Sequence, residues 1–115
     1  MENLETMFEE AIESNNAEQL AQIKQEIIKN KNATLAYKFA MECEDETKHL
    51  QKIVIKSGDA QLIYLFARDV FGAEIEKLEK AIIETENTEV MQNFADIEGA
   101  NRKKLLKKIK QLEEN

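Results

Sequence analysis

The sequence predicts an all-α fold, either a short α-solenoid or a helical bundle of stacked two-helix repeats, with about eight short helices. The first reason is composition: the 115 residues include no proline and only three glycines, the residues that most often form turns and loops. The second is a repeat of about 27 residues that recurs along most of the chain. The third is the spacing of apolar residues inside each repeat, which follows one face of a helix.

Three segments align as copies of this repeat, at residues 23–49, 50–77 and 78–104. Each copy starts with an aliphatic residue, and the same position in a partial fourth copy is Leu105. The seventeenth and eighteenth positions are Phe-Ala in all three copies. We interpret residues 1–115 as a single helical-repeat domain in which 1–22 and 105–115 are caps, because the terminal units of a repeat stack differ from the inner ones.

Capping residues predict where the helices begin and end. Asn32, Asp59 and Asn87 share the tenth position of the three copies, and such side chains accept hydrogen bonds from the free N–H groups of a first helical turn. Gly72 and Gly99 lie where two of these helices should end, since glycine readily takes the left-handed conformation that follows a helix. The expected helices, in chain order, cover residues 4–14, 17–30, 33–43, 47–57, 60–71, 74–85, 88–97 and 101–113.

The second copy shows which side of its helix should face the core. Its apolar residues between the cap and the expected end are Leu62, Ile63, Phe66 and Val70, spaced i, i+1, i+4 and i+8. The alanine that follows Phe66 allows a neighbouring helix to approach closely. Because helices this short are not stable alone, we expect the stacking of hairpins to supply their stability.

Two segments of the second and third copies carry a resemblance to known repeats, Phe66–Ala73 (FARDVFGA) and Leu78–Ile83 (LEKAII). They resemble the α-helical repeats of many uncharacterised bacterial and phage proteins, which look like compact relatives of HEAT-type solenoids. The resemblance extends over roughly residues 23–109. It implies a scaffold of stacked helices and no particular activity.

Composition narrows the classes of function. The formal net charge is −7, and no apolar run approaches the length needed to span a membrane. The first residues lack the basic and apolar regions of a signal peptide, and a single cysteine excludes an intramolecular disulfide. We therefore expect a cytoplasmic protein of a bacterial or phage-infected host cell, with no membrane partner.

The sequence contains no recognisable catalytic, cofactor or metal site, so we expect neither enzyme activity nor a cofactor. His49, the only histidine, occupies a repeat position that holds lysine in the other copies, so it should be exposed. Cys43, the only cysteine, aligns with Val70 and should be a small buried apolar side chain. The acidic run Glu42–Glu46 lacks the order of an EF-hand loop and is interpreted as a solvated turn.

The most informative surface residues lie on the second helix of each repeat. Tyr64, Arg68 and Phe71 are spaced i, i+4 and i+7, on the side opposite Phe66. Side chains of these types are enriched in the centres of protein interfaces. The candidate partner-binding residues are Tyr37, Met41, Tyr64, Leu65, Arg68 and Phe71. The alternative is that these side chains pack on the adjacent hairpin, or are single exposed apolar residues of no functional consequence.

The C-terminal segment is the strongest charge feature. Residues 101–115 hold six of the sixteen Lys and Arg but only two of the 23 Asp and Glu. The basic residues are Arg102, Lys103, Lys104, Lys107, Lys108 and Lys110. Apolar residues recur between them at helical spacing, which predicts either a capping helix whose cations complement its own dipole and the acidic body, or a surface for nucleic acid or an acidic protein.

These observations favour a non-enzymatic protein–protein interaction module. A proline-free chain rich in Lys, Asn, Ile and Glu is typical of AT-rich bacterial or phage genomes. We hypothesise a small phage-encoded inhibitor of a host defence complex, of the anti-CRISPR kind, that binds a protein or nucleoprotein complex and uses its acidity to block a nucleic-acid channel. The alternative is a nucleic-acid-binding accessory protein that uses the basic C-terminal helix, although an acidic body repels phosphates.

Overall fold

The computed structural model describes residues 3–43 and 47–114, and this part of the chain forms helices and short connections only. The helices are α1 (Leu4–Ser14), α2 (Ala17–Asn30), α3 (Ala33–Glu42), α4 (Thr47–Ser57), α5 (Ala60–Asp69), α6 (Ile75–Thr85), α7 (Thr88–Phe94) and α8 (Arg102–Glu113). The all-α prediction is confirmed, and the order and number of these eight helices match the expected series. Most boundaries agree within a residue or two.

The helix starts confirm the role assigned to the capping residues. The side-chain oxygen of Asn32 accepts a hydrogen bond from the N–H of Leu35 at 3.1 Å, and Asp59 accepts from Leu62 at 3.2 Å. Four further helix starts use the same contact, those capped by Asn3, Asn16, Asn87 and Asn101. A short polar residue before each of these six helices therefore satisfies one of its free donors and sets its first residue, whereas Glu74 before α6 makes no such side-chain contact.

The expected helix ends at residues 71 and 97, close to Gly72 and Gly99, need correction. Both glycines are left-handed, with φ of 83° and 93°, but α5 ends earlier, at Asp69, and α7 ends at Phe94. Val70 has already left the helix in an extended conformation and is buried. The glycines therefore turn the connecting loops rather than terminate the helices.

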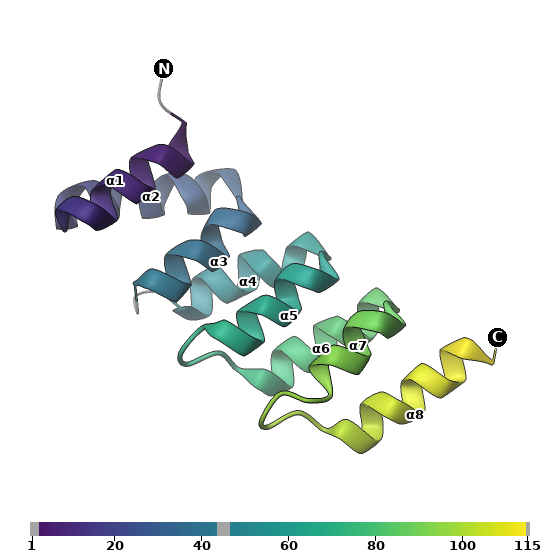
Figure 1. Ribbon diagram of the computed structural model, residues 1–115. Coiled ribbons are helices and arrows are strands. Elements are labelled where there is room, and N and C mark those ends of the chain that lie inside the picture. Colours follow the sequence, from purple (N-terminus) through teal and green to yellow (C-terminus); the bar gives the residue numbers. More distant parts are fainter. Residues whose placement is uncertain (1–2, 44–46, 115) are drawn as a thin grey trace.

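The helices form two layers in a staggered stack (Figure 1). The odd-numbered helices α1, α3, α5 and α7 pack against one another in sequence, and each is followed by an even-numbered helix with which it forms a hairpin. Successive even-numbered helices make less contact with one another. The stack measures 50 × 26 × 18 Å, and its radius of gyration of 15.6 Å exceeds the roughly 13 Å of a compact domain of this size.

The core runs along the interface between the two layers. The first repeat position is fully buried at Leu50, Leu78 and Leu105, and Phe66 is also fully buried, as expected. Leu62 is only half-buried, whereas Ala67 is buried, so the core side of α5 is rotated slightly from the expected side. No helix in the described part of the chain is both long enough and apolar enough to cross a membrane.

Two buried polar side chains connect successive even-numbered helices. Gln51 in α4 accepts a hydrogen bond from the backbone N–H of Glu74, just before α6, at 2.9 Å. Glu79, at the same repeat position in α6, accepts from the backbone N–H of Asn101, just before α8, at 2.5 Å. In the second and third copies, the second position of the repeat thus satisfies the start of the next even-numbered helix. This contact was not predicted from the sequence.

Candidate interaction surface

The structure places the candidate chemical residues His49 and Cys43 near the start of α4 and just after the end of α3. His49 is exposed, as expected. Cys43 is half-buried rather than buried, because α3 ends at Glu42 and Cys43 lies on the extended residue after it. In residues 3–43 and 47–114 no three His, Cys, Asp or Glu side chains are placed to share a metal ion. Residues 44–46 of the acidic run lie outside the described residues.

Three of the predicted surface residues are brought together by a fourth that sequence reasoning missed, Asp69. The hydroxyl of Tyr37 on α3 donates a hydrogen bond to the Asp69 carboxylate on α5. The Arg68 guanidinium binds the same carboxylate, with Nε and Nη2 at 2.7 and 3.0 Å from its two oxygens. Arg68 also lies over the ring of Tyr64, 5.5 Å from its centroid, in a cation–π contact. These four residues are called the tyrosine–arginine cluster below.

Contacts within the cluster shift the pKa values of Tyr37, Arg68 and Asp69. Burial of the Tyr37 hydroxyl and its hydrogen bond to Asp69 together raise the pKa of Tyr37 from 10.0 to about 12. The hydrogen bonds from Arg68 are the main reason that the pKa of Asp69 is lowered. The same carboxylate raises the pKa of Arg68. At neutral pH the cluster therefore holds a fixed arrangement of one cation, one anion and two phenols.

The raised pKa of Tyr37 can be tested by titration. In a Tyr64→Phe variant Tyr37 is the only tyrosine, and its ultraviolet titration should have a midpoint of about 12. Because the folded pKa lies above the unfolded value, the stability that this group contributes is full below about pH 10 and falls as the pH rises towards 12. The same variant in denaturant is the control and should titrate near 10. A midpoint near 10 while circular dichroism still reports helix would contradict the buried hydrogen bond.

The other three predicted surface residues, Met41, Leu65 and Phe71, are not members of the cluster. Met41 is 42% exposed, one helical turn after Tyr37. Leu65 is half-buried at the repeat position where Lys38 contacts Glu5 of the preceding odd-numbered helix.

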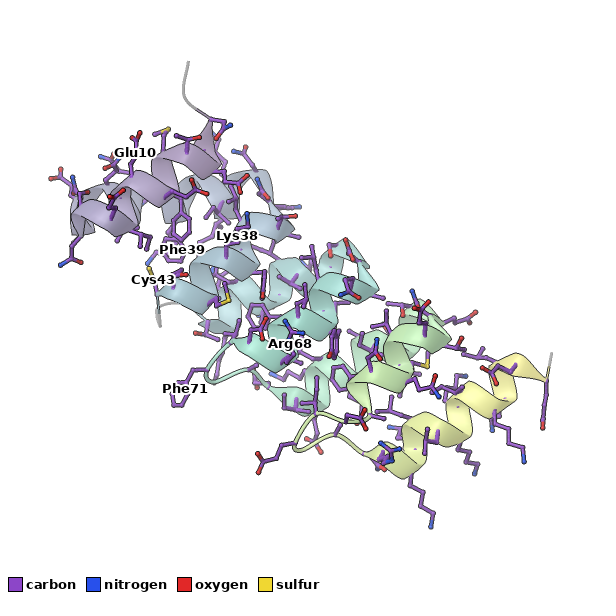
Figure 2. All side chains as sticks on the ribbon, in the orientation of Figure 1. Glu10, Lys38, Phe39, Cys43, Arg68 and Phe71 are labelled. Atoms are coloured by element: carbon purple, nitrogen blue, oxygen red, sulfur yellow. The ribbon has the colours of Figure 1, made fainter. Side chains whose placement is uncertain are left out.

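Phe71 corrects the predicted helical spacing. It lies two residues beyond the end of α5, in the loop, and its side chain is 78% exposed. Figure 2 shows it projecting away from the ribbon, apart from Arg68. The alternative of internal packing therefore applies to Tyr37 and Tyr64, which pack against the core, and not to Phe71.

A shallow groove of about 380 Å³ lies beside the cluster, between α5 and the loop after α7. Tyr64 and Arg68 form one wall, and Asp96 and Glu98 contribute to the other. Tyr64 and Asp96 are the repeat equivalents of Tyr37 and Asp69. Asp96, however, forms an ion pair with Arg102 of α8, while Tyr64 stays under Arg68. Tyr64 and Asp96 therefore do not form the hydrogen bond that joins Tyr37 to Asp69. The surface between them is a groove lined by charges of both signs.

The basic helix α8 has the features of a cap. Leu105 and Ile109 are buried against the stack, and Arg102 pairs with Asp96. Lys110 is exposed at the repeat position that holds a half-buried isoleucine in α2, α4 and α6. A polar outer face is what the last unit of a repeat stack requires. The cations of α8 are exposed except Lys108, which is half-buried.

Comparisons with known proteins give no further assignment. No protein-family model matches the chain, and no curated protein or solved structure matches it either. Function is therefore inferred from the surface itself.

Proposed function

We propose that this protein is a non-enzymatic protein-interaction module that binds its partner through the outer face of α3 and α5 and the loop carrying Phe71. The observation that carries the proposal is the 78% exposure of Phe71. The equivalent residue in the third copy is Glu98, so the repeat does not need an aromatic side chain there. An exposed phenylalanine in the loop after α5, together with the tyrosine and arginine side chains of α3 and α5, gives this surface the residue types that are enriched in protein interfaces.

The tyrosine–arginine cluster supports the same surface. Arg68 is held on two sides, by Asp69 and by the ring of Tyr64, while its side chain is still 51% exposed. A guanidinium that is already ordered loses less conformational entropy when a partner binds. Met41 and Leu65 add apolar area on the neighbouring turns of α3 and α5.

The identity of the partner stays a prediction. An acidic chain of this size could block a nucleic-acid channel in a host defence complex by presenting carboxylates in place of phosphates. In that arrangement the Phe71 surface would anchor the protein and the acidic body would fill the channel.

Phe71→Glu should weaken partner binding by about 2 kcal/mol or more while leaving the melting temperature unchanged, because the side chain contributes to the interface and not to the core. Binding is measured by calorimetry against the partner that the wild-type chain captures from its host. The matched control is Leu106→Glu, which makes the same charge change at another exposed apolar residue, 38% exposed on α8. Unchanged binding by Phe71→Glu would remove this face as the interaction surface.

The nucleic-acid alternative is favoured by one observation, the row of exposed cations on α8. It requires salt-dependent binding to DNA or RNA that is lost in a Lys107→Glu, Lys108→Glu double variant. In the experiment above, that double variant should bind the protein partner normally if the Phe71 face is the interface.

A further inference from the structure

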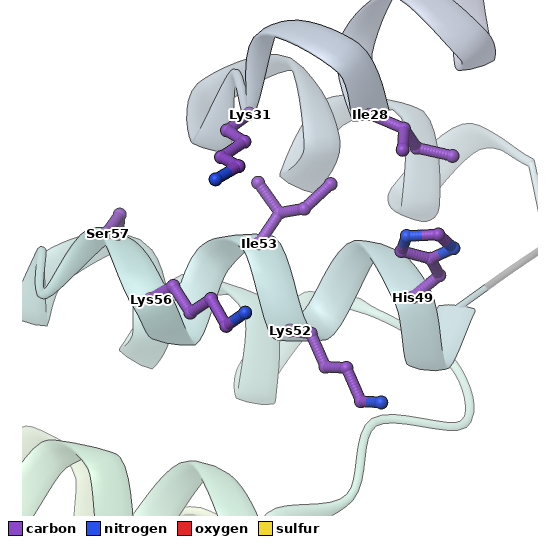
Figure 3. Close-up of a pocket in the computed structure, with 7 residues that line it drawn as sticks. All are labelled: Ile28, Lys31, His49, Lys52, Ile53, Lys56 and Ser57. Carbon is purple, nitrogen blue, oxygen red and sulfur yellow. The ribbon is translucent and has the colours of Figure 1, made fainter.

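We propose a second binding site, separate from the Phe71 surface: a groove between α2 and α4 that takes an acidic segment of a partner protein with one apolar anchor residue. The groove encloses about 330 Å³. It is lined by Ile28, Lys31, His49, Lys52, Ile53, Lys56 and Ser57 (Figure 3).

The fold explains why a groove exists here. Successive even-numbered helices make less contact than the odd-numbered ones, so α2 and α4 diverge at their outer surface. Ile28, which is half-buried, and Ile53, which is 8% exposed, form an apolar floor between them. Lys31 lies at the end of α2 and extends towards α4, whereas Lys52 and Lys56 line the groove from α4, with the Lys52 side chain extending away from α2 (Figure 3).

The charge of the groove is opposite to that of the molecule. Of the eight helices in the described part of the chain, α4 alone contains no Asp or Glu, although the net charge of the chain is −7. Lys31, Lys52 and Lys56 are all exposed, and in residues 3–43 and 47–114 no ion pair involves any of them. Three cations thus line one groove, and no ion pair within the described residues neutralises them.

The repeat provides an internal comparison that separates function from fold. One repeat further on, Gly58 occupies the position of Lys31 and Glu84 the position of Lys56. Lys80 still stands at the position of Lys52, so the equivalent positions one repeat further on hold one glycine, one cation and one anion. The stack therefore accepts neutral and acidic residues at the positions of Lys31 and Lys56, so the fold does not require cations at these two positions of the groove.

The lining identifies the chemistry of the occupant. Lys52 and Lys56 are one helical turn apart, about 6 Å, which suits two carboxylates on successive turns of a partner helix. The apolar floor between the lysines suits a leucine-sized side chain placed between those carboxylates. A nucleic-acid strand is a poorer fit, because its phosphates need a continuous track of cations and here an acidic body surrounds the groove.

The probe is a short fluorescent peptide that repeats the block Leu-Glu-Glu. It is titrated with the full chain at low and at physiological salt, and binding is followed by fluorescence anisotropy. We expect saturable binding that weakens with salt. A Lys52→Glu, Lys56→Glu double variant should lose about tenfold or more in affinity, since two attractive contacts become repulsive. The matched control is the Lys107→Glu, Lys108→Glu variant, which makes the same charge change on α8 and should bind like the wild-type chain.

Three further measurements make the result decisive. Lys56→Glu alone copies Glu84 of the next repeat, so it should fold normally, and a weaker peptide affinity with an unchanged melting temperature supports the site. A peptide with glutamine in place of glutamate, or an all-glutamate peptide without leucine, should bind more weakly than the probe. Phe71→Glu should bind the probe normally, which distinguishes this site from the proposed function.

Several results would overturn the proposal. These are no binding of the probe to the wild-type chain, equal losses in the α4 and α8 double variants, or equal binding of the all-glutamate peptide. A single-stranded oligonucleotide that binds more tightly than the peptide, and is lost with the same α4 double variant, would reassign the groove to nucleic acid.

Discussion

Phe66→Ala should lower the free energy of unfolding by about 3–5 kcal/mol, because the ring is fully buried in the middle of the stack and its loss leaves a cavity that neighbouring helices cannot fill. Phe66 belongs to α5, which contacts α3 and α7 in its own layer and α4 and α6 in the other. A cavity there affects the hairpins on both sides. Urea denaturation followed by circular dichroism measures the change.

The control for this prediction is the same substitution in the neighbouring loop. Phe71→Ala removes the same ring from a residue that is 78% exposed, so it should change stability by no more than about 0.5 kcal/mol. A loss below about 1 kcal/mol for Phe66→Ala would mean that this ring does not hold the stack together. Equal losses of unfolding free energy in Phe66→Ala and Phe71→Ala would also mean that the Phe66 ring does not hold the stack together.

Much of the fold could be predicted from the sequence because its signals are local. Asn32 and Asp59 mark helix starts through contacts with residues three positions further along the chain, and such contacts depend on sequence spacing alone. Helix ends were less predictable. Val70 leaves α5 early and is buried in an extended conformation, so its position depends on packing with the rest of the stack.

The candidate surface was only partly predictable, for a related reason. Tyr37, Tyr64 and Arg68 were identified from residue type and spacing, but Asp69, which joins Tyr37 to Arg68, is 32 residues from Tyr37. The available signal was the aspartate of the Phe-Ala-x-Asp pattern, which recurs as Asp96 only with the one-residue deletion in the third copy.

The cationic groove was missed because its residues come from two different copies of the repeat. Lys31 lies in the first copy, and Lys52 and Lys56 in the second. Reading one copy at a time does not reveal their proximity. The absence of acidic residues from Thr47–Ser57 was the available signal.

Gln51 joins α4 to the start of α6, and its substitution is expected to have the second large effect on stability. Gln51→Ala should lower the free energy of unfolding by about 2–4 kcal/mol, since it leaves the N–H of Glu74 without its acceptor and removes a side chain that is only 2% exposed. The amide of Gln51 also donates to the Glu74 carboxylate at 3.2 Å, so a single residue makes two bonds across the α4–α6 junction. The measurement is again urea denaturation.

Glu79→Gln is the matched control for the Gln51 variant. It places at the α6–α8 junction the residue that α4 already uses, and it keeps an acceptor for the N–H of Asn101. We expect a change of no more than about 1 kcal/mol, because the hydrogen bond is retained with an uncharged oxygen. If Gln51→Ala lowered the free energy of unfolding no more than this control does, the hydrogen bonds of Gln51 would contribute little to stability. A large loss confined to Gln51→Ala would instead show that α4 and α6, which make little direct contact, are held in register by this one polar side chain.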